Sequence, residues 1–386
     1  MATMIRRRFA PILALCLLAA TETAPALSVN EIEPLDFTSP RERSMGGRHV
    51  ALADDSSVLL TNPAGLAELP KSYSAADLGL RMIGPVFDIA DLVAGGKMST
   101  SSLTDFLAKN DYKVYAGFEL AGPLALGYTG GGMGFGLFNK TKFIANVAGA
   151  SAINLTTGED ILLSGGYARR FDLGSGHELD AGFAPKGFAR GEIKSSMGIV
   201  EAVDLSSHPG DILNDPFTLT TGVGLDLGLR WAWRQLAAGL ACRDLFSPAI
   251  ATQYSSASAF FGSKSGESSY VWVHRSLDAG LAWNPDIGQW LRGVDSLVLA
   301  LDYRDILDLW SITPRNPVLN IGFGLEARVL DIVSLRAGVA DALLSTGLGL
   351  DLKVFKLNLS VFGTELGLEP GDRPCYNLLF DLDFRY

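Results

Sequence analysis

The chain has 386 residues, of which 48% are hydrophobic and 19% are charged, and its formal net charge is −10. After the N-terminal region, no stretch approaches the roughly 20 apolar residues that a membrane helix needs, although the mean hydropathy of +0.22 is high for a soluble protein. The 43 glycines weaken helices and suit a crowded, curved sheet. The negative charge argues against a nucleic-acid partner.

The N-terminus has the three parts of a secretory signal peptide. Arginines occupy positions 6–8, an apolar run covers 12–20, and Ala24-Pro25-Ala26 is a small-residue cleavage site. We therefore expect residues 1–26 to be removed after export. An uncleaved anchor is one alternative, but the apolar run is too short to span a membrane. Cys16 leaves lipidation open, although the bulky Leu15 precedes it and the apolar run continues past it.

Residues 27–70 precede the first predicted strand and contain a helix-like stretch near 47–68. Glycines, a turn and small residues mark this segment: Gly46, Gly47, Asn62, Pro63, Ala64 and Gly65. The paired glycines let the backbone turn where side chains would clash. The asparagine before proline indicates a turn, because proline pushes the preceding residue out of the helical region. These features predict a closely packed segment that contains turns.

Apolar and polar residues alternate along many segments, as they do on a strand whose two faces meet different surroundings. In the segment 318–328, Leu319, Ile321 and Phe323 share one face, and Gly322 and Gly324 share the other. The number of long, glycine-rich segments of this kind predicts an all-β transmembrane barrel rather than a soluble sandwich. The predicted strands are 71–82, 112–128, 133–145, 159–171, 177–189, 217–230, 235–245, 269–283, 295–304, 316–328, 332–340, 346–354, 357–365 and 375–386.

The connections between these strands sort by length. Those after even-numbered strands are mostly short, and those after odd-numbered strands are mostly long. The short ones are 129–132, 172–176, 231–234, 329–331 and 355–356, with 284–294 longer, and the long ones are 83–111, 146–158, 190–216 and 246–268. Outer-membrane barrels have short periplasmic turns and long external loops. The pattern predicts a barrel of about fourteen strands over 71–386, with a first loop that is helical over 86–108.

The chain ends in an alternating strand with aromatic residues on one face. The outward residues include Phe380, Leu382, Phe384 and Tyr386. This resembles the C-terminal signal by which the barrel assembly machinery recognises outer-membrane proteins. The alternative is an ordinary amphipathic last strand.

Residues 44–69 give the most specific resemblance. The Gly-Gly step, the alanine-rich segment with acidic residues at 51–55, and the Asn-Pro-Ala-Gly turn at 62–65 together resemble the plug of the FadL family of outer-membrane transporters. The resemblance implies that residues 27–70 form a plug inside the barrel, and the alternative is an amphipathic helix that covers its periplasmic mouth. It also implies passive, ligand-gated uptake of long-chain fatty acids or other hydrophobic compounds. Outer-membrane lipid would surround the barrel, and the loops 83–111 and 190–216 would gather the ligand.

The same resemblance implies a lateral exit at a kink in the third strand. The candidate kink here is Gly122-Pro123, because proline cannot donate to the sheet ladder. It falls in the second predicted strand, which does not match the family. The glycines at 130–132 are either an alternative bend or a turn.

Other classes of function are less well supported by the residues. His274 and Ser276 lie two residues apart on one strand, but this spacing is generic, and we predict no enzyme, no cofactor and no metal. Cys242 and Cys375 are too few for a disulfide framework.

A general porin is disfavoured if the segment 27–70 fills the lumen. Inward charges of both signs, such as Asp226 and Arg230, are expected to pair across the wall. A scaffold or shuttle in protein secretion or assembly remains open, and it should have a filled lumen instead of a continuous apolar pocket.

Overall fold

The computed structural model describes residues 30–95, 98–122, 126–149, 152–287, 293–352 and 354–385. The predicted signal peptide with Cys16, as well as Pro123 and Tyr386, lies outside these ranges. Within them, no helix is both long enough and apolar enough to span a membrane.

The described residues form one sheet that closes on itself. The closing pair is β2 (Ser72–Ile83) with β18 (Pro374–Arg385), which run antiparallel. The other wall segments are β3 (Lys113–Ala121), β4 (Leu126–Gly130), β5 (Met133–Ala148), β6 (Ile153–Gly174), β7 (His177–Met197), β8 (Phe217–Trp233), β9 (Leu236–Phe246), β10 (Pro248–Tyr254), β11 (Glu267–Val273), β12 (Ser276–Trp283), β13 (Val294–Tyr303), β14 (Ile321–Val329), β15 (Val333–Ala340), β16 (Leu343–Asp351) and β17 (Phe355–Glu365). Three barrel strands consist of two segments each, namely β3 with β4, β9 with β10, and β11 with β12. The prediction of a fourteen-stranded antiparallel barrel is therefore confirmed.

The outer face of the wall is apolar at every second position. On β14, Ile321 and Phe323 are exposed, whereas Gly322 and Gly324 face the interior and Glu326 is buried. Exposed apolar side chains that alternate with interior polar or small ones on a closed sheet are the pattern of a lipid-facing wall. The interior charges of both signs pair as predicted, for example Arg243 with Asp278 on the neighbouring strand β12.

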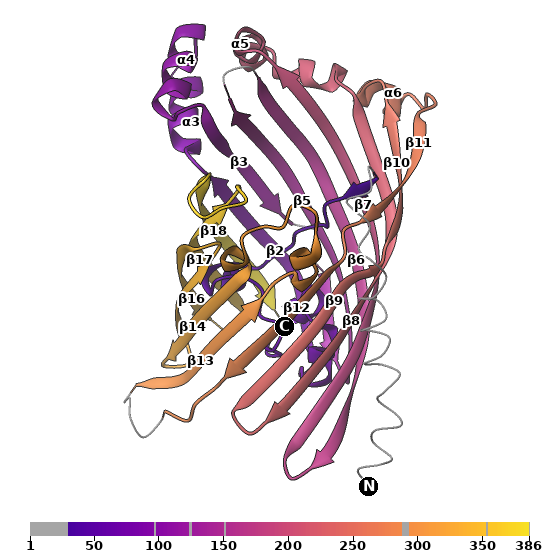
Figure 1. Ribbon diagram of the computed structural model, residues 1–386, viewed down its shortest axis with the longest axis vertical. Helices are drawn as coiled ribbons and strands as arrows, with labels where there is room; N and C mark the ends of the chain where they lie inside the picture. The colour runs from indigo at the N-terminus through magenta and orange to yellow at the C-terminus, as the bar shows by residue number, and fades with distance from the viewer. Residues whose placement is uncertain are drawn as a thin grey trace.

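The wall is uneven in height. β6 and β7 have 22 and 21 residues, whereas β15 has 8. Figure 1 shows the long strands rising on one side, above the ends of β14 and β16. The predicted helical first loop is confirmed as two helices, α3 (Val86–Ala94) and α4 (Thr100–Lys109). The other external connections carry α5 (Ile199–Ser207), η3 (Pro209–Asn214), α6 (Ala257–Phe261), η4 (Ile306–Trp310) and η5 (Pro317–Asn320).

Three local expectations need correction. The connection predicted at 146–158 is short, because β5 and β6 run on until only 149–152 separate them. The strand predicted from 316 begins at Ile321, because Pro317 lacks an N–H and the residues 317–320 form the turn η5. The glycines at 130–132 have positive φ and form the hairpin turn between β4 and β5, so they are not a bend in a strand.

The helix-like stretch near 47–68 is not a helix. The segment instead holds α2 (Pro40–Ser44) and two 3-10 turns, η1 (Ser56–Leu59) and η2 (Pro63–Ala67). The side chains of Asp55 and Asn62 accept hydrogen bonds from backbone N–H groups two residues on, so each begins a new turn. Local side-chain bonds therefore override the helical spacing of the apolar residues.

The closing pair of strands can be tested with a disulfide. Leu80 lies opposite Phe380, so the variant L80C/F380C, made without the native cysteines, should oxidise readily. Their Cα atoms are about 5 Å apart for directly paired residues, within the reach of a disulfide. The control L80C/F384C is displaced by four residues, or about 13 Å along the strand, and should not cross-link. Equal cross-linking of both variants, measured by electrophoretic mobility, would contradict the register.

Candidate functional site

The N-terminal residues 30–70, here called the luminal segment, lie inside the barrel. Its helix α2 contacts β15, β16, β17 and β18, whereas η2 contacts β5, β6, β7 and β8 on the other side of the wall. Its first residues form β1 (Glu31–Ile32), which pairs in parallel with β11. A segment that touches opposite arcs of a closed sheet crosses its lumen, and Figure 1 shows β1 among the long strands.

Glycines in the wall make room for this segment. A Cβ added to Gly182 would lie 2.5 Å from the carbonyl oxygen of Pro63, and one added to Gly228 would lie 1.9 Å from Oδ1 of Asn62. On the opposite arc, a Cβ on Gly324 would lie 2.2 Å from the Met45 carbonyl oxygen. The backbone of the luminal segment thus packs directly on the backbone of the wall, at positions where any side chain would clash.

Asn62 joins the luminal segment to itself and to the wall. Its side chain is fully buried, and its Nδ2 donates to the carbonyl oxygens of Val50 at 2.6 Å and Leu229 at 3.1 Å. Its Oδ1 accepts from the backbone N–H of Ala64 at 3.1 Å. A buried amide without such partners would be strongly destabilising, so these bonds specify where the turn lies.

A second buried contact surrounds Asp302 on β13. Its Oδ2 lies 2.5 Å from Nδ1 of His49, and its Oδ1 accepts from the N–H of Val50 at 2.9 Å. The other ring nitrogen of His49 lies 2.9 Å from the Met45 carbonyl oxygen. One wall carboxylate therefore holds the backbone just after the Gly46-Gly47 step.

Ion pairs complete the attachment. The guanidinium of Arg41 contacts Glu326 on β14 at 2.9 Å and also Asp54 at 2.6 Å and Asp55 at 3.0 Å. Glu326 in turn accepts from Arg336 at 2.6 Å. Removing one partner of a buried pair leaves an uncompensated charge, at a cost of about 3–5 kcal/mol. These contacts favour one position of the luminal segment.

The start of the luminal segment is held by cations. Arg190 pairs with Asp160 at 2.9 Å and donates to the Glu33 carbonyl oxygen at 2.9 Å. Asp36 pairs with Arg43, and with Arg48 at 2.8 Å. Burial raises the pKa of the Asp36 carboxyl, but the cations around it outweigh burial and hold that pKa well below its usual range. Asp36 is therefore a carboxylate at neutral pH.

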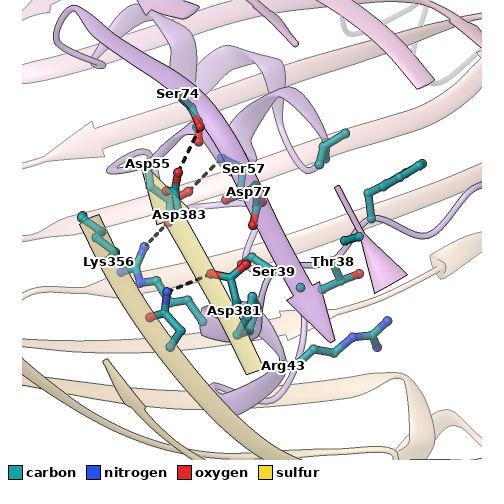
Figure 2. A pocket seen from close by; sticks show the side chains of 18 of the residues that line it. Thr38, Ser39, Arg43, Asp55, Ser57, Ser74, Asp77, Lys356, Asp381 and Asp383 are labelled. Carbon is teal, nitrogen blue, oxygen red and sulfur yellow. Dashed lines mark hydrogen bonds and ion pairs between the residues drawn. The ribbon is translucent and has the colours of Figure 1, made fainter. Parts of the chain in front are cut away.

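A cavity of about 350 Å³ remains between the luminal segment and the wall. Figure 2 shows Ser74, Asp77, Asp381 and Asp383 of β2 and β18 near Ser39 of the luminal segment. Ser74 donates to Asp383 at 3.0 Å across the closing pair of strands. Charged side chains line much of the cavity, including Arg43, Arg81, Glu119, Lys140, Lys356, Asp381 and Asp383. Apolar residues line another part, namely Phe37, Leu59, Leu60, Leu126 and Phe138. The cavity is amphipathic, so it is not the continuous apolar pocket that we expect of a transporter.

The second barrel strand changes its pairing beside this cavity. β2 pairs with β3 through Gly79–Ile83 and with β4 through Ser72–Ser74, and the two pairings differ in register by one residue, because Gly79 lies opposite Ala121 and Ser74 opposite Gly127. We call this change of register at the end of β3 the interruption. Gly122 lies at the interruption with φ +79°, and its N–H donates to the Asn139 carbonyl oxygen on β5 at 3.0 Å. An added Cβ would lie 1.7 Å from the Asp77 carbonyl oxygen, so glycine is required. The interruption lies in the second barrel strand, and the role of Gly122 and Pro123 as a kink stays a prediction.

The structure locates the other predicted residues as follows. Gly46 and Gly47 have φ of +86° and +114° and lie against β14, β15 and the Arg304 side chain. Phe380, Leu382 and Phe384 pair along β17 and β2, while their role as an assembly signal stays a prediction. His274 lies between β11 and β12 and contacts Glu31 and Asp305. No group of His, Cys, Asp or Glu in the described ranges is arranged to hold a metal ion.

Sequence reasoning missed the wall residues that hold the luminal segment. Gly182, Gly228, Asp302 and Glu326 make its principal contacts. The alternation of the strands predicts that these positions face the interior. No local pattern of residues indicates which part of the luminal segment each one contacts.

Comparison with known proteins assigns a family. Residues 61–296, well over half of the chain, match the model described as "F plasmid transfer operon, TraF, protein". The chain belongs to this family. The match to the TraF family begins at the Asn62 turn and includes the wall through β12. Curated proteins yield no match.

Several solved structures resemble this TraF-family chain. The Ralstonia pickettii toluene transporter TbuX has a TM-score of 0.48 at 10% identity, covering 93% of this chain and 98% of its own. A Pseudomonas aeruginosa FadL homologue has a TM-score of 0.45 at 13% identity, with coverages of 93% and 99%. The monoaromatic hydrocarbon channel CymD has a TM-score of 0.45 at 11% identity, with coverages of 92% and 98%.

Two glycines of β7 provide a matched test of the luminal contact. G182A places a methyl group against the Pro63 carbonyl, whereas a Cβ at Gly187 meets nothing within 4 Å. Overpacking should destabilise G182A by about 1–3 kcal/mol and leave G187A near the wild type. The measurement is the temperature at which the folded form is lost in semi-native electrophoresis. Equal stabilities would show that the segment does not press on Gly182.

Proposed function

We propose that this protein is an outer-membrane transporter that takes up hydrophobic compounds, such as long-chain fatty acids, by passive, ligand-gated diffusion. The observation that carries the proposal is the amphipathic cavity between the luminal segment and the interruption at Gly122. A barrel that served only as an anchor would need no cavity beside its plug.

The cavity suits a ligand that has an apolar chain and an anionic head. Phe37, Leu126 and Phe138 offer apolar surface to the chain. Arg81 and Lys140 lie in the charged part, where both contact Glu119, at 3.1 and 3.5 Å. A ligand carboxylate would compete with Glu119 for these cations. The apolar end would then point toward Leu126, beside the interruption.

The luminal segment would act as the plug. Lys140 donates to the Asp36 carbonyl oxygen at 2.6 Å, so a ligand head that binds Lys140 would loosen the start of this segment. The contacts of Arg41 and Asn62 would hold the remainder in place. Gating in this proposal is a local displacement near Asp36, with the turn at Asn62 fixed.

The cavity assignment predicts selectivity for an anionic head. K140M should weaken binding of a long-chain fatty acid about tenfold or more, because a charge-assisted hydrogen bond contributes about 1.5–3 kcal/mol. Binding of the matching fatty alcohol should change little. The control K194M alters an exposed lysine that is absent from the cavity lining. Equal effects of K140M on acid and alcohol, measured by calorimetry in detergent, would contradict the assignment.

The plug assignment predicts a change in conductance. Deleting residues 27–65 should open a pore in planar bilayers, because the contacts that fill the lumen are removed. E326Q weakens one contact of Arg41 and should produce brief openings in a full-length barrel. Steady, wild-type conductance in both variants would contradict a plug.

A second candidate is a scaffold or shuttle in protein secretion or assembly. It is favoured by the family match, whose description names a plasmid transfer operon, and by the many contacts that hold the luminal segment. Under this candidate the wild type would bind no fatty acid, and cavity substitutions such as K140M would have no effect on its activity. The binding measurement above therefore separates the two candidates.

A further inference from the structure

The barrel has a low side whose strands are only just long enough to cross a membrane. β14, β15 and β16 have 9, 8 and 9 residues. A membrane-spanning strand tilted at about 45° needs roughly 9–11 residues. Both ends of these three strands must therefore lie at the membrane surfaces.

The residues on the outer face of the low side support this position of the strand ends. It is apolar up to the external ends of the strands, where Ile321, Val339 and Leu344 are all exposed. If these apolar side chains were in contact with water, their exposure would be energetically unfavourable. The external ends of β14–β16 therefore coincide with the upper limit of the lipid.

The tall side behaves differently. On β6 the outward residues Ile161 and Leu163 are exposed and apolar, but the next outward residue toward the external end is Glu159, which accepts from Asn139 at 2.7 Å. Beyond it, Ile153 and Leu155 are buried in a cluster with residues of α4 and α5. Helices thus cover the apolar face of the wall only where it extends above the lipid.

A rigid connection lies on top of the low side. Residues 304–320 join β13 to β14 and are fixed to the neighbouring turns. Arg304 and Arg315 both contact Asp341, at 2.9 and 3.0 Å. The N–H of Asn316 donates to the Leu368 carbonyl oxygen at 2.9 Å. We call residues 304–320, 341–344 and 366–373 the low rim.

The low rim presents exposed apolar side chains. Trp310 is 68% exposed and Ile312 is 73% exposed, and Leu344 and Leu368 are exposed as well. The hydrogen bonds and ion pairs described above hold the connection in one conformation. The apolar side chains are therefore exposed on an ordered surface. Tryptophan and tyrosine are enriched at the boundary between lipid and water.

We propose that the low rim lies in the interfacial region of the outer leaflet, with Trp310 and Ile312 in contact with lipid. Ligands would enter the lumen by passing over this rim. An amphiphile already dissolved in this leaflet would cross the low rim into the lumen without passing through bulk water. The upper part of the tall side would extend into the external water. The entry step rests on the proposed transport function, whereas the position of the rim does not.

The position can be measured with spin labels in full-length protein reconstituted in phosphatidylcholine vesicles. Single cysteines would replace Ile312 on the low rim and Phe261 in α6, in chains in which the buried Cys242 and Cys375 are replaced by alanine. Phe261 is a matched control because it is equally apolar and 79% exposed, but it lies at the tip of the tall side (Figure 1).

Label relaxation by oxygen, which concentrates in lipid, should dominate at position 312. Relaxation by a water-soluble nickel chelate should dominate at position 261. Nickel access at 312 that matches access at 261 would overturn the proposed position, and so would oxygen access at 261 that matches access at 312.

The entry step has a separate test. The double variant W310D/I312D should lower the rate of uptake of a long-chain fatty acid supplied from the outer leaflet several-fold, while its affinity in detergent stays unchanged. The control F261D alters an apolar residue on the tall side that is also exposed and lies outside the loops expected to gather the ligand, and it should transport normally. Unchanged uptake in W310D/I312D would overturn the entry route. Absence of uptake in the wild type would instead reject the transport function, and the spin-label result would stand.

Discussion

The structure depends on the need to pair every backbone N–H and C=O group that faces lipid. A bilayer offers these groups no hydrogen bonds, so a sheet inside it has to close, and here it closes through β2 and β18. At the interruption beside Gly122 the backbone keeps its bond to Asn139 on β5, while the pairing toward β2 changes register by one residue. The cavity lies beside this change of register.

The interior is organised in the opposite way to that of a soluble protein. Apolar residues face outward, so the luminal segment is held by backbone contact at glycines and by buried polar groups. Buried ion pairs such as Arg41–Glu326 contribute little net stability compared with apolar packing, but they penalise any other arrangement. The same feature makes the cavity amphipathic, because the charges that position the segment also line the space beside it.

Because its wall is taller on one side than on the other, the barrel is asymmetric within the plane of the membrane as well as across it. The low rim and the tall side differ by more than ten residues of strand length, and the chain covers the apolar outer face of the tall side with α4 and α5. The interruption at Gly122 and the low rim lie on different arcs of the wall. A ligand path that begins at one and ends at the other would pass the luminal segment, which is where the cavity lies.

The sequence by itself determined the strands, their number and their inward and outward faces, because the alternation of a strand is a local property with a period of two. It did not determine the conformation of residues 47–68, where the side chains of Asp55 and Asn62 begin new turns against the helical spacing. Only the tertiary structure decided which interior residues meet: Arg41 and Glu326 are 285 positions apart, and Gly228 looks like any other interior glycine until Asn62 is placed against it. Such contacts depend on how the closed sheet brings distant strands around one segment, and no local pattern of residues encodes that arrangement.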